Sequence, residues 1–206
     1  MTILSVEVLS SGICRVVSYE NGTFYLRPDY LKTITKDCFF SQKDFNDDLT
    51  SEIIDAGLIT ACECKAVEYL SRAEQCRFGL IKKLTDKGYN KAYIEPALDY
   101  LEKMNYLSDI RFARSWLNTR KINHAEGKAK LLVELTGRGI LKETSVSALD
   151  DFFSENDEKQ IAEKCFSKLK KKGKTGDKLI SAMIQQGFSY KTAVTLENNG
   201  GVFPEE

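Results

Sequence analysis

The side chains that could bind a metal or attack a substrate are few and scattered along the 206 residues of this chain. His124 is the single histidine, and the six cysteines are spread from Cys14 to Cys165. Cys62 and Cys64 have one residue between them, whereas zinc and redox pairs usually have two. We therefore predict reduced cysteines, no metal site and no cofactor.

Patterns for acid-base, nucleophilic or phosphate chemistry are also missing from the sequence. Gly127-Lys128 resembles the end of a phosphate-binding loop, but no glycine stands five residues earlier and no strand is predicted before it. Asp47-Asp48 and Asp150-Asp151 are adjacent pairs, and adjacent side chains on a helix point apart, so these indicate a solvated surface. We predict a binding protein without catalytic residues.

The basic residues give the better lead to function. The chain as a whole is neutral, with 30 Lys and Arg against 30 Asp and Glu. Residues 1–60 hold five basic and nine acidic side chains, residues 61–149 sixteen and eleven, and residues 150–206 nine and ten. A basic middle beside an acidic N-terminal part suits DNA phosphates or the acidic face of a protein partner. The predicted contacts are Arg72, Lys82, Lys83, Arg111, Arg114, Arg120, Lys121, Lys128, Lys130, Arg138, Lys170, Lys171 and Lys172.

Aromatic residues are interleaved with these cations. Tyr100, Tyr106 and Trp116 could stack on bases, but Trp116 lies at helical spacing from Phe112 and a place in the core explains it as well. The run from 168 to 174, KLKKKGK, could bind phosphate, or could be a solvated helix end where cations suit the dipole.

Three glycines mark an internal repeat that must position these residues. Gly88, Gly139 and Gly187 are 51 and 48 residues apart. Apolar residues recur eight and four positions before each glycine and directly after it, which is typical of stacked units that share a core. These residues are Leu80, Leu84 and Tyr89 in the first copy, Leu131, Leu135 and Ile140 in the second, and Leu179, Met183 and Phe188 in the third.

Each copy has a further apolar helix before its glycine-ended helix, so the unit is three helices. We predict a mainly α fold of tandem three-helix repeats that form a curved, elongated array with a small N-terminal three-strand extension. The predicted divisions are a strand-containing region with a helix at 1–60, repeats at 61–107, 108–155 and 156–198, and a frayed tail at 199–206.

Helix ends are clearest in the first repeat. Gly88 can close one helix in the left-handed conformation, and Asn90 can cap the next. That next helix has an apolar stripe from Ile94 to Met104, in which Pro96 requires either a later helix start or a bend. Asn105 also tolerates the left-handed region. The stripe consists of Ile94, Ala97, Leu98, Leu101 and Met104.

The following helix is predicted to begin at Ser108 or Asp109, either of which can act as its cap. Phe112 and Ala113 are expected to hold this repeat together, with Phe112 in the core.

The pattern of the first thirty residues predicts three short antiparallel strands. Asn21-Gly22 is a strong hairpin signal, and Pro28 should end the third strand because it cannot donate to a sheet ladder. A helical pattern follows from Ser41 to Thr60, with Gly57 as its expected stop. A sheet this small is expected to pack on helices.

Neither a membrane-spanning run nor an N-terminal targeting pattern is present, which predicts a cytoplasmic protein.

Two segments resemble the RecX family of regulatory proteins. Leu101–Ala113, LEKMNYLSDIRFA, is similar to the family segment in which a Leu-Glu helix runs into Asp-x-Arg-Phe-Ala. Gly127–Ile140, GKAKLLVELTGRGI, resembles the family's second-repeat helix in register. The resemblance covers about residues 61 to 197. The third repeat matches more loosely.

The resemblance implies a modulator of the RecA recombinase in DNA recombination, repair and the SOS response. Members of that family bind the RecA filament on DNA, lie in its groove, and inhibit strand exchange, ATP hydrolysis and co-protease activity. The expected partners are the RecA filament and single- or double-stranded DNA, the latter bound weakly by the protein alone, and the expected state is a monomer.

Two other functions remain open from the residues. A helical-repeat protein could bind DNA without RecA, which predicts tight, salt-dependent binding to bare strands. Alternatively, the chain could be a protein adaptor whose acidic N-terminal part is the docking face.

Overall fold

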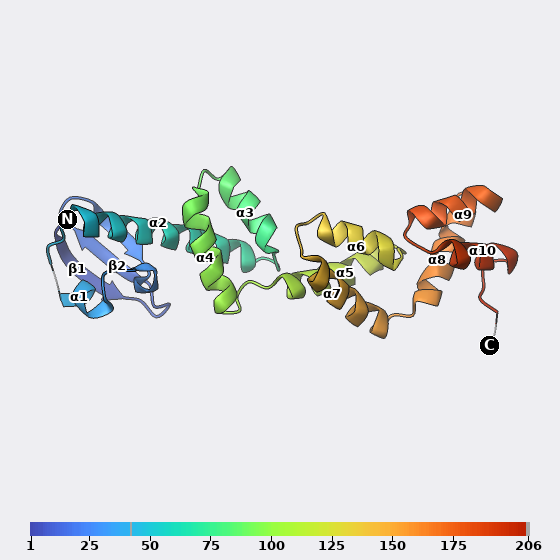
Figure 1. The fold of residues 1–206 in the computed structure, drawn as a ribbon, viewed down its shortest axis with the longest axis horizontal. Helices are drawn as coiled ribbons and strands as arrows, with labels where there is room; N and C mark the ends of the chain where they lie inside the picture. The colour runs from blue at the N-terminus through green and yellow to red at the C-terminus, as the bar shows by residue number, and fades with distance from the viewer. Residues whose placement is uncertain (42, 205–206) are drawn as a thin grey trace. The chain divides into compact units, whose positions relative to one another are not determined.

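The computed structural model describes residues 1–41 and 43–204, which form two compact units, Met1–Leu107 and Ser108–Glu206. The described residues are mostly helical, with one small three-stranded sheet, as predicted. The predicted curvature of the array stays a prediction. In the first unit the elements are β1 (Ile3–Val8), β2 (Cys14–Ser18), β3 (Gly22–Leu26), the 3-10 helix η1 (Pro28–Tyr30), α1 (Lys36–Ser41), α2 (Asp47–Leu70), α3 (Arg77–Asp86) and α4 (Lys91–Lys103) (Figure 1).

The sheet is antiparallel in the order β1-β2-β3, so the three predicted strands are confirmed. Ser18 pairs with Gly22, which leaves a three-residue loop and places Gly22 in the left-handed region at φ 66°. The side chains of Cys14, Val16 and Leu26, on strands β2 and β3, are fully buried in the core that the sheet covers. β3 ends before Pro28, as expected, and the proline starts η1 instead.

Helix α2 is longer than the sequence pattern indicated. Asn46 caps it by accepting a hydrogen bond from the Leu49 amide at 3.0 Å, and the helix continues through Gly57 to Leu70. The predicted stop at Gly57 is therefore wrong, because buried α2 residues continue on both sides of it. The predicted division between residues 60 and 61 falls inside this helix, so α2 packs on the sheet with one half and on α3 and α4 with the other (Figure 1).

The first repeat closes its helices as expected. Gly88 is left-handed at φ 88°, and the next amide, of Tyr89, donates to the Leu84 carbonyl at 3.1 Å. The Asn90 side chain accepts from the Ala92 amide at 3.0 Å, so α4 starts at Lys91.

The start at Lys91 places Pro96 in the interior of α4 and excludes a later start. Four residues of the predicted apolar stripe are fully buried, but Met104 is 47% exposed, so the buried part of the stripe ends at Leu101. The reason is that α4 ends at Lys103 and Asn105 is left-handed at φ 58°, so Met104 lies at the cap.

A buried ion pair joins the sheet to the first repeat. Arg27, directly after β3, donates from Nε and Nη2 to the two carboxylate oxygens of Glu63 on α2, at 2.8 and 2.6 Å. The hydroxyl of Tyr30 donates to the same carboxylate at 2.9 Å. The Arg27 guanidinium also lies 4.5 Å from the ring centre of Tyr100 on α4. Hydrogen bonds to Glu63 raise the pKa of Arg27, and burial, together with the Glu63 carboxylate, raises the pKa of Tyr30.

The second unit contains two three-helix repeats. The glycines at 139 and 187 are left-handed, at φ 79° and 90°, and both end a helix, as predicted. Ile140 and Phe188, directly after them, are 2% and 4% exposed and return the chain to the core. The helices are α5 (Asp109–Asn123), α6 (Lys128–Thr136), α7 (Lys142–Glu155), α8 (Glu158–Lys171), α9 (Gly176–Gln185) and α10 (Tyr190–Asn198).

Ser108, and not Asp109, caps α5, because its hydroxyl accepts from the Arg111 amide at 3.4 Å. Asp109 is the first residue of the helix, where its carboxylate suits the positive end of the dipole. Phe112 is only half-buried, and the α5 core residues are Ala113 and Leu117 instead.

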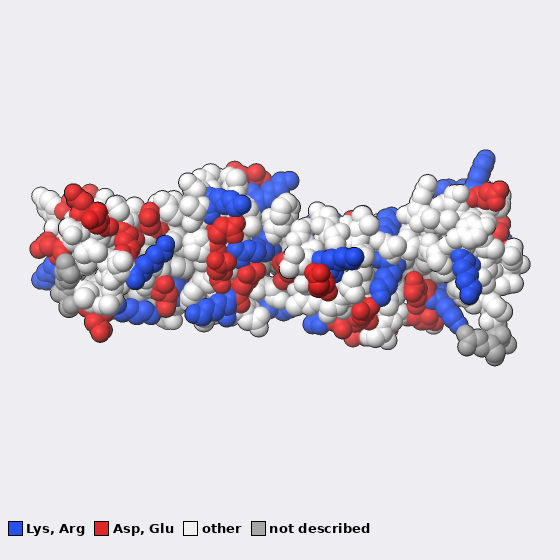
Figure 2. Space-filling view, viewed as in Figure 1, with Lys and Arg blue, Asp and Glu red and all other residues white. Residues whose placement is uncertain are grey.

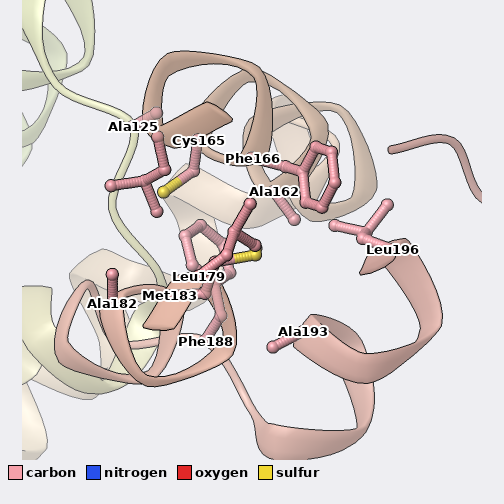
Figure 3. Packing of buried hydrophobic residues seen from close by; sticks show 11 residues of the cluster. Ala125, Ala162, Cys165, Phe166, Leu179, Ala182, Met183, Phe188, Ala193 and Leu196 are labelled. Carbon is pink, nitrogen blue, oxygen red and sulfur yellow. The ribbon is translucent and has the colours of Figure 1, made fainter. Parts of the chain in front are cut away.

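The core of the third repeat gathers side chains from α8, α9 and α10 (Figure 3). Residues 199–204, which were predicted to fray, make contacts with the third repeat. Gly201 takes a positive φ, and its amide donates to the Leu196 carbonyl at 2.7 Å. Phe203 packs against the core, and its amide donates to Glu163 at 3.0 Å. Residues 205–206 lie outside the described residues.

Two glycines bring the backbones of the second and third repeats together. The Gly127 amide donates to the Gln186 carbonyl at 2.8 Å, and a Cβ on Gly127 would lie 2.3 Å from the carbonyl oxygen of Gly187. A Cβ on Gly187 would lie 2.5 Å from the amide nitrogen of Lys130. Ala125, just before this contact, is buried in the third repeat's core, so the α5–α6 loop belongs to both repeats.

Breaking the buried ion pair is expected to destabilise the first unit strongly. Glu63→Gln leaves the Arg27 charge buried without a carboxylate, which costs about 3–5 kcal/mol of unfolding free energy in comparable pairs. Urea unfolding followed by circular dichroism measures this loss. The control is Arg72→Gln, which breaks an exposed pair with Glu68 and should leave the unfolding midpoint unchanged. Equal effects of the two substitutions would contradict the structural role of the buried pair.

Adding a methyl group at the glycine contact should also destabilise the fold. Gly127→Ala forces a backbone shift, and overpacking of this kind costs about 1–3 kcal/mol. Gly57→Ala is the matched control, because its new Cβ would meet Phe24 and Tyr25 at an ordinary 3.5 Å and should stabilise α2. Thermal unfolding of both variants checks the opposite signs, and a stabilised Gly127→Ala protein would show that the two repeats are not in backbone contact.

Candidate partner-binding surface

Many of the basic residues predicted to bind a partner already bind carboxylates of the same chain. In the second repeat, Arg120 donates from Nε and Nη2 to Glu126 at 2.6 and 3.0 Å. Lys130 contacts the same carboxylate at 2.8 Å. Glu126 is 4% exposed, so this cluster is an internal part of the α5–α6 turn. Its two cations, Arg120 and Lys130, are already neutralised by the Glu126 carboxylate.

These contacts set the ionisation of Glu126. Burial opposes its negative charge, but hydrogen bonds from Arg120 and Lys130 outweigh that effect and lower its pKa to about 2. The carboxylate is therefore ionised at neutral pH. It holds α5, the loop and α6 together in the folded protein.

Trp116 belongs to the same cluster. Its ring centre lies 5.0 Å from the Arg120 guanidinium and 4.7 Å from that of Arg138. Arg138 also donates to Glu134 at 3.1 Å. Because two cations of this chain already contact the ring, a structural role explains Trp116 better than stacking on a base.

Two further predicted contacts pair with α7. Arg114 donates from Nε to Asp151 at 2.9 Å, and the Lys128 ammonium lies 2.5 Å from Asp150. The Asp150 and Asp151 side chains point apart on an exposed surface, as predicted, and each contacts a different cation. In the first unit, Arg72 pairs with Glu68 at 2.6 Å, and in the second Arg111 is half-buried.

The remaining predicted residues form no ion pair with a carboxylate within residues 1–41 and 43–204. Lys83 binds the Gln75 amide oxygen at 2.6 Å, and Lys121 binds the Asn156 amide oxygen at 3.2 Å. The Lys170 ammonium lies 5.5 Å from the Phe166 ring centre. We call this set the open lysines: Lys82, Lys83, Lys121, Lys170, Lys171 and Lys172.

Basic and acidic side chains are mixed on the surface of the protein. On the face shown in Figure 2, Lys and Arg side chains alternate with Asp and Glu over much of each unit. A count of basic residues in the sequence therefore overstates the charge available to a partner. No single basic face is visible in that view.

One open lysine borders a cavity of the second unit. A cavity of about 600 Å³ opens between the ends of α5 and α7 and the start of α8. Its apolar wall includes Leu117 and Phe152, while Lys121 and His124 contribute polar groups. His124 thus lines a surface cavity.

The described part of the chain contains no candidate metal site and no candidate membrane-spanning helix. No three His, Cys, Asp or Glu side chains there are grouped so that they could hold a metal ion. No helix among the described residues is both long and apolar enough to cross a membrane.

The Arg27–Glu63 pair is a buried polar cluster that the sequence analysis did not predict. Its members are 36 residues apart and belong to no recognisable motif. The available signal was weak: a glutamate within the apolar α2 pattern, flanked by Cys62 and Cys64. A buried acid needs a cation, but the sequence does not say which one.

Fold and surface together define a tandem three-helix protein with a small N-terminal sheet and a mixed-charge surface. Residues 65–101 match the family model described as RecX, first three-helix domain, which spans the end of α2, α3 and most of α4. The chain is 35% identical over 127 residues to the "Regulatory protein RecX" of Treponema pallidum (strain Nichols), covering 62% of this chain and 77% of that protein.

The chain belongs to the RecX family of regulatory proteins. It is also 25% identical over 199 residues to the "Regulatory protein RecX" of Clostridium perfringens (strain SM101 / Type A), covering 91% of each chain. Among solved structures, "Crystal structure of regulatory protein RecX" aligns with a TM-score of 0.75 at 19% identity, over 96% of this chain and 98% of that one. At 19% identity, this structural similarity shows a shared fold.

The low pKa of Glu126 predicts an acid-dependent stability. Its stabilising effect is complete above the unfolded pKa of 4.5 and is lost as the pH falls toward the folded value of about 2. The difference in unfolding free energy between the native protein and Glu126→Gln should therefore shrink from pH 6 to pH 2. Urea titrations across this range measure it. A difference that does not change with pH would contradict the ion-pair assignment.

Proposed function

We propose that this protein is a non-enzymatic regulator of homologous recombination and DNA repair that binds the RecA filament on DNA. It inhibits the recombinase, ATPase and co-protease activities of that filament and acts as a monomer in the cytoplasm. Membership of the RecX family supports the regulatory role. The target and the inhibited activities follow from the resemblance to that family.

The observation that carries the proposal is the division of the basic residues. Arg114, Arg120, Lys128, Lys130 and Arg138 bind carboxylates of this chain and shape the second repeat. The open lysines contact only neutral groups or solvent within the described residues. We therefore assign contacts with DNA phosphates or acidic filament groups to the open lysines.

The open lysines fall in separate groups along the chain, and each group alone should bind bare DNA weakly. Each phosphate contact releases counterions, so affinity and its salt dependence grow with the number of available cations. The first repeat supplies Lys82 and Lys83, the second Lys121, and the third its run at the end of α8. A filament can engage these separate groups together, which gains affinity through effective concentration.

ATP hydrolysis by RecA on single-stranded DNA tests the proposal. Stoichiometric addition of the native protein should slow hydrolysis. The Lys171→Gln/Lys172→Gln variant should need about tenfold more protein for the same inhibition, because each lost 1.4 kcal/mol of binding is a factor of ten. Fluorescence anisotropy on bare single-stranded DNA should show weak binding by both proteins.

The matched control is Arg114→Gln/Lys128→Gln, which removes the same two charges from paired residues. It should inhibit within about twofold of the native protein, since exposed ion pairs contribute little. Circular dichroism confirms that both variants are folded. No inhibition by the native protein would overturn the proposed target, whereas equal losses in both variants would overturn only the assignment to open lysines.

A further inference from the structure

The cavity between the ends of α5 and α7 and the start of α8 combines apolar walls with charged side chains (Figure 1). Its volume of about 600 Å³ lies within the range of about 300–1,000 Å³ that is usual for ligand sites. We call it the α5–α8 cavity. Leu117, Phe152 and Ile161 line it with apolar surface, and Ile122 adds an apolar side chain that is 68% exposed.

Cations lie along the side of the cavity that α5 and α8 form. Lys164 on α8 and His124 at the end of α5 line the cavity, and neither pairs with a carboxylate within residues 1–41 and 43–204. Lys168 lies one turn further along the same face of α8, and its ammonium donates to the Asn123 carbonyl at 3.1 Å. That carbonyl carries no net charge, so Lys168 keeps its positive charge beside the cavity.

Three carboxylates also line the α5–α8 cavity, and other groups of the chain compensate two of them directly. Glu126 is bound by Arg120 at 2.6 Å and by Lys130 at 2.8 Å. Asp157 caps α8 by accepting a hydrogen bond from the Lys159 amide at 2.8 Å. Its carboxylate therefore lies at the positive end of the α8 dipole.

Glu155 is the third carboxylate, and it lies near the α7–α8 turn, nearly two helical turns before Lys164. The next residue, Asn156, accepts a hydrogen bond from the Lys121 ammonium at 3.2 Å, so a cation lies beside this turn as well. Positive charge without a nearby carboxylate is therefore found at the other end, around Lys164 and His124. An acidic group of a ligand is favoured at that end.

The walls of the cavity suit a protein side chain better than a nucleic-acid base. Phe152 is only 7% exposed, and its ring centre lies 5.1 Å from that of Phe153 and 5.8 Å from the Lys121 ammonium. Phe152 therefore offers no open face on which a base could stack. Glu155 and Asp157 would also repel a phosphate backbone that crossed the α7–α8 turn.

We propose that the α5–α8 cavity binds an acidic segment of a partner protein, in which an apolar side chain lies beside Asp or Glu. The apolar side chain fills the space between Leu117, Phe152 and Ile161, and the carboxylates face Lys164 and Lys168. An apolar anchor in a pocket with charged residues around it is a common arrangement in protein recognition. This site goes beyond the proposed function, because it requires neither DNA nor a particular partner.

Three short fluorescent peptides test this inference on the full chain. The first carries leucines among aspartates, the second leucines among lysines, and the third serines among aspartates. Fluorescence anisotropy should show binding of the Leu/Asp peptide. The Leu/Lys and Ser/Asp peptides should each bind at least about tenfold more weakly, because one lacks the acidic groups and the other the apolar anchor.

Variants of exposed side chains then locate the site. Lys164→Gln removes a cation of the cavity and Ile122→Ser an apolar side chain, and each should weaken Leu/Asp binding by about fivefold or more. The matched controls are Lys191→Gln on α10 and Val133→Ser on α6, which change exposed side chains outside the cavity and should leave binding unchanged. Circular dichroism checks that all four variants are folded.

Three results would overturn the inference. The first is equal binding of the Leu/Asp and Ser/Asp peptides, and the second is unchanged Leu/Asp affinity in both cavity variants. The third is a loss of single-stranded oligonucleotide binding in Lys164→Gln without a loss of peptide binding, which would assign the cavity to nucleic acid. The peptide assay contains neither RecA nor DNA, so its failure is distinguishable from a failure of RecA inhibition.

Discussion

The left-handed residue after the second helix of each repeat is the constraint on which the helical part of the structure depends. Gly88, Gly139 and Gly187 reverse the chain within one residue, and an apolar side chain directly after each returns to the core. At Gly187 the same freedom from a Cβ also admits the backbone of Gly127. One requirement for glycine thus serves both helix closure and the contact between the second and third repeats.

Two buried clusters of charged side chains stabilise the fold of this family member. The clusters around Glu63 and Glu126 join separate elements of the fold, and their carboxylates are buried with full sets of donors. Arginine is well suited to such sites because its planar fork matches a carboxylate. Lysines without a carboxylate remain available at the surface, and we propose that the filament neutralises these residues.

Local sequence patterns predicted much of the fold, but they did not predict the features that depend on contacts between residues distant in the sequence. Helix ends at Gly88 and Asn90 and the hairpin before Gly22 depend on conformations that a few neighbouring residues determine. The predicted helix stop at Gly57 was wrong because tertiary packing of α2 outweighs a local preference. The sequence identified the basic residues as one group. It could not separate the cations that bind carboxylates from the open lysines, because partners such as Asp151 and Glu126 are brought near them only by the fold.

Lysine acetylation footprinting of this protein on RecA filaments, read by mass spectrometry, tests the central claim most directly. The two classes of lysine on one molecule act as their own control. Filament binding should protect Lys82, Lys121 and Lys170–Lys172 from acetylation, while Lys128 and Lys130 react at the same rate with and without the filament. Protection confined to Lys128 and Lys130 would contradict the account.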